Sequence, residues 1–170
     1  MDEAQFQQFY PLVFSWIQQT VADHAGRARP VASAHFPRLP SYFQPATLAS
    51  ARFVAVAATP TPPLSELGLD QFSDFENIAA AGITYLDTIF VLESLVDDES
   101  LFFHELVHVI QWGILRPERF LLAYAEGLEQ KGYRQSPLEA MAYAAGDLFQ
   151  SQSRPFAVEE WVETRLEMAP

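Results

Sequence analysis

The sequence of 170 residues contains no cysteine. Disulfides, thiolate nucleophiles and cysteine-bound zinc are therefore excluded together, and any metal ion must be held by histidine and carboxylate side chains. Basic residues are also few, since ten lysines and arginines stand against 22 acidic residues and the formal net charge is −12. Nucleic acid and a polyanionic membrane surface would be repelled overall, so the composition argues against either partner.

A secretory signal and a long apolar run are lacking as well. The first residues, Met1-Asp2-Glu3-Ala4-Gln5, have neither the basic nor the apolar segment of a signal peptide. No stretch approaches the roughly 18 uncharged apolar residues of a membrane span. We therefore expect a soluble, cytoplasmic protein with no membrane partner.

Length and composition are typical of one packed domain. A chain of 170 residues can bury about 70% of the surface that it exposes when unfolded. Hydrophobic residues make up 49% of the chain and aromatic residues 14%, which fits a packed core. We find no internal repeat, linker or second core, so residues 1–170 are predicted to form a single domain.

One stretch, LFFHELVHVIQW at residues 101–112, places the pattern His-Glu-x-x-His in an otherwise almost wholly apolar run. On a helix, which turns about 100° per residue, His104 and His108 project from one face, and Gln111 falls on the same side. Two imidazoles so placed can share one zinc ion, while Glu105 can act as general base for a water molecule that the metal activates. This is the chemistry of a zinc peptidase.

The alternative is a buried helix whose two histidines are satisfied by hydrogen bonds in the core. Burying two imidazoles and a carboxylate costs on the order of several kcal/mol unless they are paired or bind a metal ion. Because the neighbouring positions are so apolar, the sequence favours the metal site.

A catalytic zinc ion usually has three protein ligands, and the third is not given by the motif. No histidine follows His108, and Gln111 and Ile114 stand where a metzincin has glycine and histidine, so the third ligand must be a carboxylate. The near candidates are Glu126, Glu129, Glu139 and Asp147. Glu126 and Asp147 lie opposite the apolar faces of their helices and should face water.

Glu139 differs because it flanks a buried face and shares its side with Ala142 and Gly146. These small residues would let its helix approach the motif helix closely, and a glycine inside a helix invites a packing reason. The competing role is local, since Ser136 and Glu139 also form the S-x-x-E pattern of a capping box. We favour Glu139 as the third metal ligand.

The remaining pattern predicts several helices and a little sheet. We expect an amphipathic helix or a helix pair over residues 6–26, in which the main helix starts near Tyr10 or bends at Pro11, and a motif helix that ends at Gly113. We expect strands over residues 52–57 and 83–92, the second with Asp87 either at a bulge or edge open to an extended peptide or simply facing solvent. Three more helices are predicted to start at Pro117, at 136–137 and near 157, and the first of them to stop at Gly132.

Residues 25–65 contain no acidic residue and four arginines, at positions 27, 29, 38 and 52. This basic loop is either a cradle for an acidic peptide or chain terminus, or a segment whose arginines pair with the acidic remainder of the protein, which we favour. His24, near the end of its helix, is expected to interact with the helix dipole and not with a metal, and His35 is expected to be structural or solvated.

The motif and the residues around it carry a resemblance. HELVH at 104–108 followed by Glu139-Ala140-Met141-Ala142 resembles the gluzincin pattern, and residues 80–160 as a whole resemble a group of small bacterial HExxH proteins. The resemblance implies a minimal metallopeptidase fold with a small sheet beside the motif helix. Together with the predicted helices, it leads us to expect a mostly helical α+β domain.

The resulting hypothesis is a zinc peptidase acting on a peptide or protein. His104, His108 and Glu139 would hold Zn²⁺, and Glu105 would take a proton from water and pass it to the leaving amine. Tyr133 and Tyr143 are candidates for a second donor to the oxyanion, although each is equally a core or rim aromatic. Two alternatives remain: a zinc-binding regulatory module without activity, and an interaction domain without metal.

Overall fold

Four short strands form a mixed sheet in the computed structural model, which describes residues 3–151 and 154–168. The strands are β1 (Arg29–Pro30), β2 (Arg52–Val56), β3 (Gly82–Tyr85) and β4 (Thr88–Leu92), in the order β1-β2-β4-β3. The central pair, β2 and β4, is parallel, and the two outer pairs are antiparallel. Strand β3 therefore lies at one edge of the sheet.

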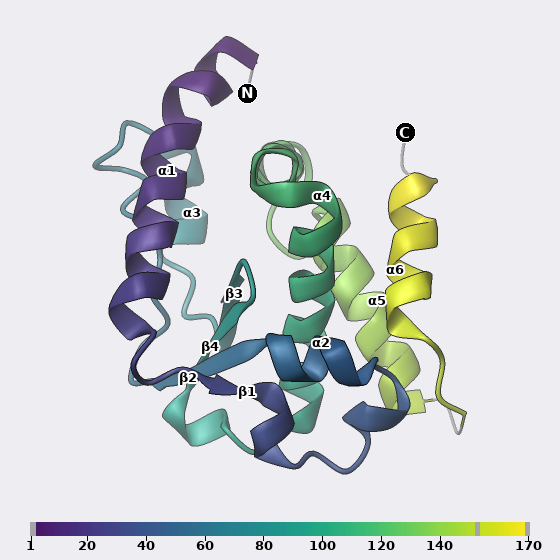
Figure 1. Ribbon diagram of the computed structural model, residues 1–170. Coiled ribbons are helices and arrows are strands. Elements are labelled where there is room, and N and C mark those ends of the chain that lie inside the picture. The colour runs from purple at the N-terminus through teal and green to yellow at the C-terminus, as the bar shows by residue number, and fades with distance from the viewer. Residues whose placement is uncertain (1–2, 152–153, 169–170) are drawn as a thin grey trace.

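Helices make up most of the rest of the chain and surround the sheet (Figure 1). They are α1 (Glu3–His24), α2 (Pro45–Ser50), α3 (Ser73–Glu76), α4 (Glu99–Lys131), α5 (Pro137–Ser151) and α6 (Val158–Glu167). Short 3₁₀ turns occupy Val31–Ala34, Leu39–Ser41, Asp70–Phe72 and Glu93–Leu95. The expected α+β, mostly helical single domain with a small sheet beside the motif helix is confirmed.

The alternation of side chains along β4 explains why helices cover both faces of the sheet. Ile89 and Val91 belong to the core cluster that contains Phe103 of α4, whereas Phe90 belongs to the cluster that contains Ile17 of α1. Successive strand residues point to opposite faces, so a strand that is apolar at every position must be covered twice. The motif helix is thereby fixed against one face of the sheet.

Helix α4 is broken, but not where the sequence predicted. The motif helix continues through Gly113, and the break falls at Arg116, whose φ of 63° and ψ of 162° are not helical. Proline disfavours helical geometry in the residue before it, so Pro117 sets the break and begins the second half. The predicted end at Gly113 is wrong, whereas the end at Gly132 is confirmed. The two halves run in different directions (Figure 1).

The run 83–92 was predicted as one strand and forms two. Strands β3 and β4 are joined by a tight turn at Leu86 and Asp87, and Leu86 has a φ of 59°. Asp87 is exposed in this turn, where its carbonyl oxygen accepts a hydrogen bond from the Arg52 N–H at 2.7 Å. Asp87 therefore marks neither a bulge nor a position within an edge strand.

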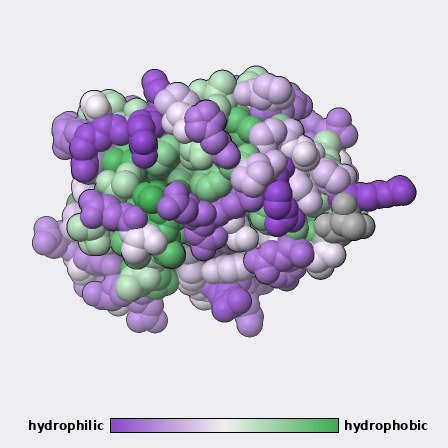
Figure 2. All heavy atoms as spheres, turned by 90° about the horizontal axis from the view of Figure 1, so that it is seen from below, coloured by the Kyte–Doolittle hydropathy of each residue, from purple (hydrophilic) through white to green (hydrophobic). Residues whose placement is uncertain are grey.

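The N-terminal segment forms one helix and not a pair, and the predicted start near Tyr10 is wrong, because α1 starts at Glu3 and includes Pro11. Met1 and Asp2, the first two residues of the segment Met1–Gln5, lie outside the described residues. Within the described part of the chain, no helix is both long and apolar enough to span a bilayer. On the face seen from below, hydrophilic side chains lie all around smaller hydrophobic areas (Figure 2).

Two arginines of the basic loop contact aromatic rings. The guanidinium carbon of Arg29 lies 4.7 Å from the ring centre of Phe53, and that of Arg38 lies 3.7 Å from the ring centre of Phe149. Arg38 also donates to the Phe149 carbonyl, and its backbone N–H donates to Glu99. Of these contacts, those of Arg38 join the segment 25–65 to α5 and to the start of α4. His35 is exposed, and His24 contacts the carbonyl oxygen of Thr20, in keeping with structural roles.

The glycine that allows two helices to approach is Gly127, not Gly146 as expected. A Cβ built on Gly127 would lie 2.8 Å from both Pro137 Cδ and Ser136 Cβ, whereas one built on Gly146 meets nothing within 4 Å. The close contact therefore joins the second half of α4 to the start of α5.

We expect Gly127→Ala to destabilise the protein by about 1–2 kcal/mol, since the overlap outweighs the gain in helix propensity. The matched control is Gly146→Ala, which should stabilise the protein by about 0.5–1 kcal/mol. Urea unfolding followed by circular dichroism measures both, and a gain in stability for both variants would contradict the close contact.

Candidate metal centre

The first half of α4 presents the two motif histidines side by side. Their Nε2 atoms are 3.2 Å apart, and His108 is buried while His104 keeps some exposure. Spacing of four residues on a helix accounts for this, because it places both imidazoles one turn apart on one face. The pair needs only a third group opposite it to form a site.

Helix α5 supplies that group, Glu139. Its carboxylate oxygens lie 3.4 Å from His104 Nε2 and 3.4 Å from His108 Nε2. One ligand atom from each of these three residues can be chosen so that all lie within 4.8 Å of one another. This buried His-His-Glu group could hold a metal ion.

The Glu139 carboxylate does not cap the start of α5. In a capping box the carboxylate would accept from the Ser136 N–H, but that N–H donates to the carbonyl oxygen of Tyr133 at 3.2 Å. The Ser136 hydroxyl is buried and has no hydrogen-bond partner among the described residues. The Ser136 N–H at the start of α5 is thus satisfied by the preceding turn. The Glu139 carboxylate is not needed there and faces the histidines.

Gln111, whose role the sequence did not reveal, orients His108. Its side-chain nitrogen donates to the Leu138 carbonyl oxygen at 3.1 Å, so its oxygen must be the atom that lies 2.8 Å from His108 Nδ1. That contact requires a proton on Nδ1, which leaves the Nε2 lone pair of neutral His108 directed at the cluster. Gln111 is fully buried, and a buried glutamine three residues after a motif histidine is the signal that could have revealed it.

Charges in the metal-free centre are strongly coupled. Burial acts to lower the pKa of His108, but the charge and hydrogen bond of Glu139, with smaller effects of Glu105 and Gln111, raise it to about 9. Burial likewise acts to raise the pKa of Glu139, but His108 and His104 hold it well below its usual value. Without metal, a proton therefore compensates the buried carboxylate.

A metal ion fits the same place. Two imidazole nitrogens and a carboxylate oxygen are electron-pair donors, and their convergence in a buried site calls for a cation. Glu139 Oε2 is buried and has no hydrogen-bond partner among the described residues, although it lies 3.4 Å from His104 Nε2. Neutral histidines would each offer Nε2 to the same ion.

Glu105 is positioned from the sheet. Its Oε2 accepts a hydrogen bond of 2.7 Å from the hydroxyl of Thr84 on β3, and only 4% of the residue is exposed. A Cβ built on Gly82, also on β3, would lie 2.8 Å from Glu105 Oε1. The sequence did not indicate these roles of Thr84 and Gly82. Glycine at position 82 provides the space that the carboxylate occupies next to the cluster.

Three tyrosines lie around the centre. The Tyr124 hydroxyl donates to Glu139 Oε1 at 2.7 Å. The sequence did not predict this contact, because Tyr124 stands at helical spacing among the apolar residues of the second half of α4. Of the two predicted tyrosines, Tyr143 has its ring centre 4.7 Å from that of His104. For Tyr133, burial and then the charge of Glu139 raise the pKa of the hydroxyl, and both also raise the pKa of Tyr143. All three therefore stay protonated.

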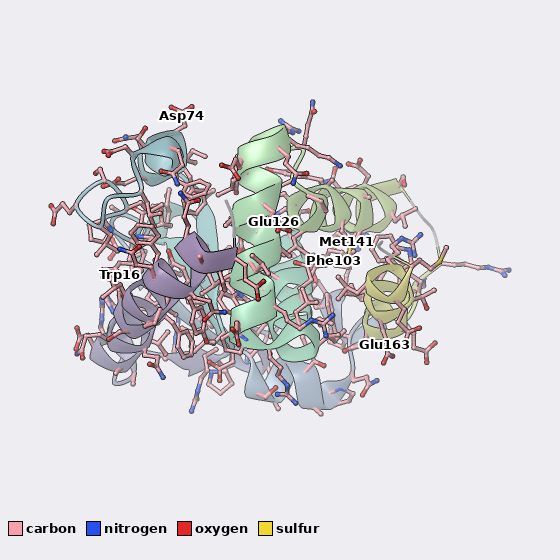
Figure 3. The ribbon with its side chains drawn as sticks, turned by 90° about the horizontal axis from the view of Figure 1, so that it is seen from above. Trp16, Asp74, Phe103, Glu126, Met141 and Glu163 are labelled. Atoms are coloured by element: carbon pink, nitrogen blue, oxygen red, sulfur yellow. The ribbon has the colours of Figure 1, made fainter. Side chains whose placement is uncertain are left out.

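The other predicted carboxylates stand apart from this group. Glu126, Glu129 and Asp147 are exposed, as the face argument required for Glu126 and Asp147. Figure 3 shows Glu126 on the second half of α4, and Met141 of α5 near Phe103 of α4 where the helices pack. The structure brings together His104, His108 and Glu139, with Glu105 beside them.

An apolar cleft of about 110 Å³ adjoins the centre. Glu105, His108 and Tyr133 line it together with residues of α1, of the segment 61–80 and of the second half of α4. The group that could hold a metal ion is thus next to a space that could admit a ligand.

We expect the stability of the metal-free protein to fall as pH rises from about 6.5 to about 9. The folded protein keeps a proton on His108 that the unfolded chain releases, so this stabilisation is complete below pH 6.5 and is lost above the folded-state pKa. Urea unfolding at a series of pH values, after treatment with chelator, measures the effect. His108→Asn should remove this slope and His35→Asn should keep it; a flat profile for the unaltered protein would contradict the coupling.

Comparisons of this chain with protein-family models, with curated proteins and with solved structures find no match.

Proposed function

We propose that this protein is a zinc-dependent metallopeptidase. The observation that carries the proposal is the arrangement of His104, His108 and Glu139 within 4.8 Å of one another, with Glu105 buried beside them at the end of a cleft. A site that only bound a metal ion would need ligands but no further carboxylate beside them. A carboxylate that is not one of them, yet is held at the same place, is what hydrolysis requires.

Zinc is the metal that this ligand set favours. Two histidines and one glutamate, without cysteine, form a ligand set of catalytic zinc sites, in which three protein ligands leave a position for water or substrate. The ion supplies Lewis acidity, which polarises a carbonyl group and makes water easier to deprotonate. The contacts of Gln111 with His108 and of Tyr124 with Glu139 orient the ligands for it.

The protein's own groups carry the proton transfers. Glu105 accepts a proton from water and returns it to the leaving amine, and the Thr84 hydroxyl fixes the position of one oxygen of its carboxylate. Tyr133 and Tyr143 are neutral donors beside the centre, and either can stabilise negative charge on the carbonyl oxygen of the substrate.

The edge of the sheet limits how a peptide can bind. Strand β3 is an edge strand, but the Thr84 carbonyl oxygen already accepts a hydrogen bond of 3.1 Å from Trp112 Nε1. A peptide that added to β3 as a further strand would have to share this acceptor with Trp112, since a carbonyl oxygen has two lone pairs. Contacts outside the strand pairing would therefore contribute to substrate binding.

We expect Glu105→Gln to abolish peptide hydrolysis, by about 10²–10⁴-fold or more, while zinc stays bound, because the amide cannot accept the proton. Glu126→Gln, at an exposed position on the same helix, is the matched control and should change neither property. Elemental analysis of protein purified without a histidine tag gives the zinc content, and a broad peptide library gives the activity.

Unchanged hydrolysis in Glu105→Gln would sink the scheme. Stoichiometric zinc without cleavage of any peptide by the unaltered protein would favour the regulatory module that retains zinc for stability. Metal content near zero after zinc supplementation would favour the interaction domain without metal.

A further inference from the structure

The walls of the cleft beside the metal centre are apolar. Phe9 and Val13 of α1 face it from one side, Phe72 and Phe75 come from the segment 61–80, and Leu121 and Ala125 come from the second half of α4. No lysine, arginine or aspartate of the described residues lines it, and its only acidic residue is Glu105 at the centre itself. A negatively charged group entering the cleft would lose its hydration without gaining a charged partner, and a positively charged group would find only Glu105. An apolar group would gain by leaving water.

The outer wall is held in place. Leu64, Leu69 and Phe72 form a small core cluster of their own, against which Phe9 and Val13 of α1 pack. Glu76 Oε2 accepts hydrogen bonds from the Ser65 N–H at 2.9 Å and the Ser65 hydroxyl at 2.8 Å, which closes the segment on itself. The cleft is thus lined by ordered elements and is formed before any ligand enters.

The position of the cleft decides what enters it. Glu105, His108 and Tyr133 are among its lining residues, so an occupant lies directly beside groups that would take part in hydrolysis of a peptide bond. The part of a peptide that can fill this cleft is the side chain of a residue next to the scissile bond.

We propose, on the basis of the peptidase function above, that this cleft selects substrates with a large apolar side chain, such as leucine or phenylalanine, next to the scissile bond. The residues that determine this specificity are those of the walls, among them Val13 of α1 and Ala125 of the second half of α4. Small and charged side chains leave the cleft empty or are excluded from it.

Filling the cleft from either wall tests the proposal. Ala125→Phe and Val13→Phe place a ring in the space from different helices, so a folding defect in one leaves the other informative. Leu12→Phe is the matched control, because Leu12 neighbours Val13 on α1 but is 49% exposed and points away from the cleft. Circular dichroism and zinc content check that each variant is folded and loaded.

The first measurement is kcat/KM for peptides that differ only at the residue next to the cleaved bond. The unaltered protein should prefer Leu or Phe over Ala, Asp and Lys by at least tenfold, a preference that both filled variants lose and the control retains. Cleavage without this preference would overturn the inference while the peptidase function stands.

The second measurement is binding, and it does not need activity. N-acetyl-phenylalaninamide should shift the backbone amide resonances of cleft residues in the unaltered protein and in Glu105→Gln, but not in the filled variants. Equal binding by the filled variants would overturn the inference. If no peptide is cleaved but the probe binds in this way, the peptidase function fails and the apolar specificity of the cleft stands.

Discussion

The contact between Glu139 of α5 and the two histidines of α4 is the constraint on which the rest of the structure depends. A buried carboxylate 3.4 Å from two imidazole nitrogens must be compensated by a proton or a metal ion. To make this contact, the chain must leave the motif helix, turn and return. The break at Arg116 and Pro117 turns it, and Gly127 lets the start of α5 pack closely against the second half of α4.

The parts of the centre that the sequence predicted are those fixed by helical periodicity. His104, Glu105 and His108 lie within five residues, so the helix alone determines how they project. Glu139 was selected because its helical face, unlike those of Glu126 and Asp147, pointed inward, and its neighbour Leu138 is buried as expected. Glu126 and Asp147 are exposed, as their positions opposite the apolar faces of their helices predicted. Periodicity predicts these residues correctly because the burial of each depends only on its position around its own helix.

The parts that were missed depend on contacts between elements. Gln111 bonds to Leu138, Tyr124 to Glu139 and Thr84 to Glu105, and each pair joins segments between 15 and 27 residues apart. Backbone conformations with positive φ at Leu86 and Arg116 were missed too, because neither residue type favours them. The prediction for Gly146 was wrong for the same reason: a small residue on a helix shows where close packing is possible, and only the partner helix decides where it occurs.

The metal ligands and the candidate base are positioned by different parts of the fold. Gln111 and Tyr124, both on α4, hold His108 and Glu139, whereas Thr84 and Gly82 of β3 determine where the Glu105 carboxylate lies. Changes in the edge strand can therefore move the carboxylate without moving the ligands, and changes at the junction of α4 and α5 can loosen the ligands without moving the carboxylate. Glu105 and the histidines lie on one continuous helix, but a different neighbour orients each side chain. Metal binding and hydrolysis can therefore be changed separately in this fold.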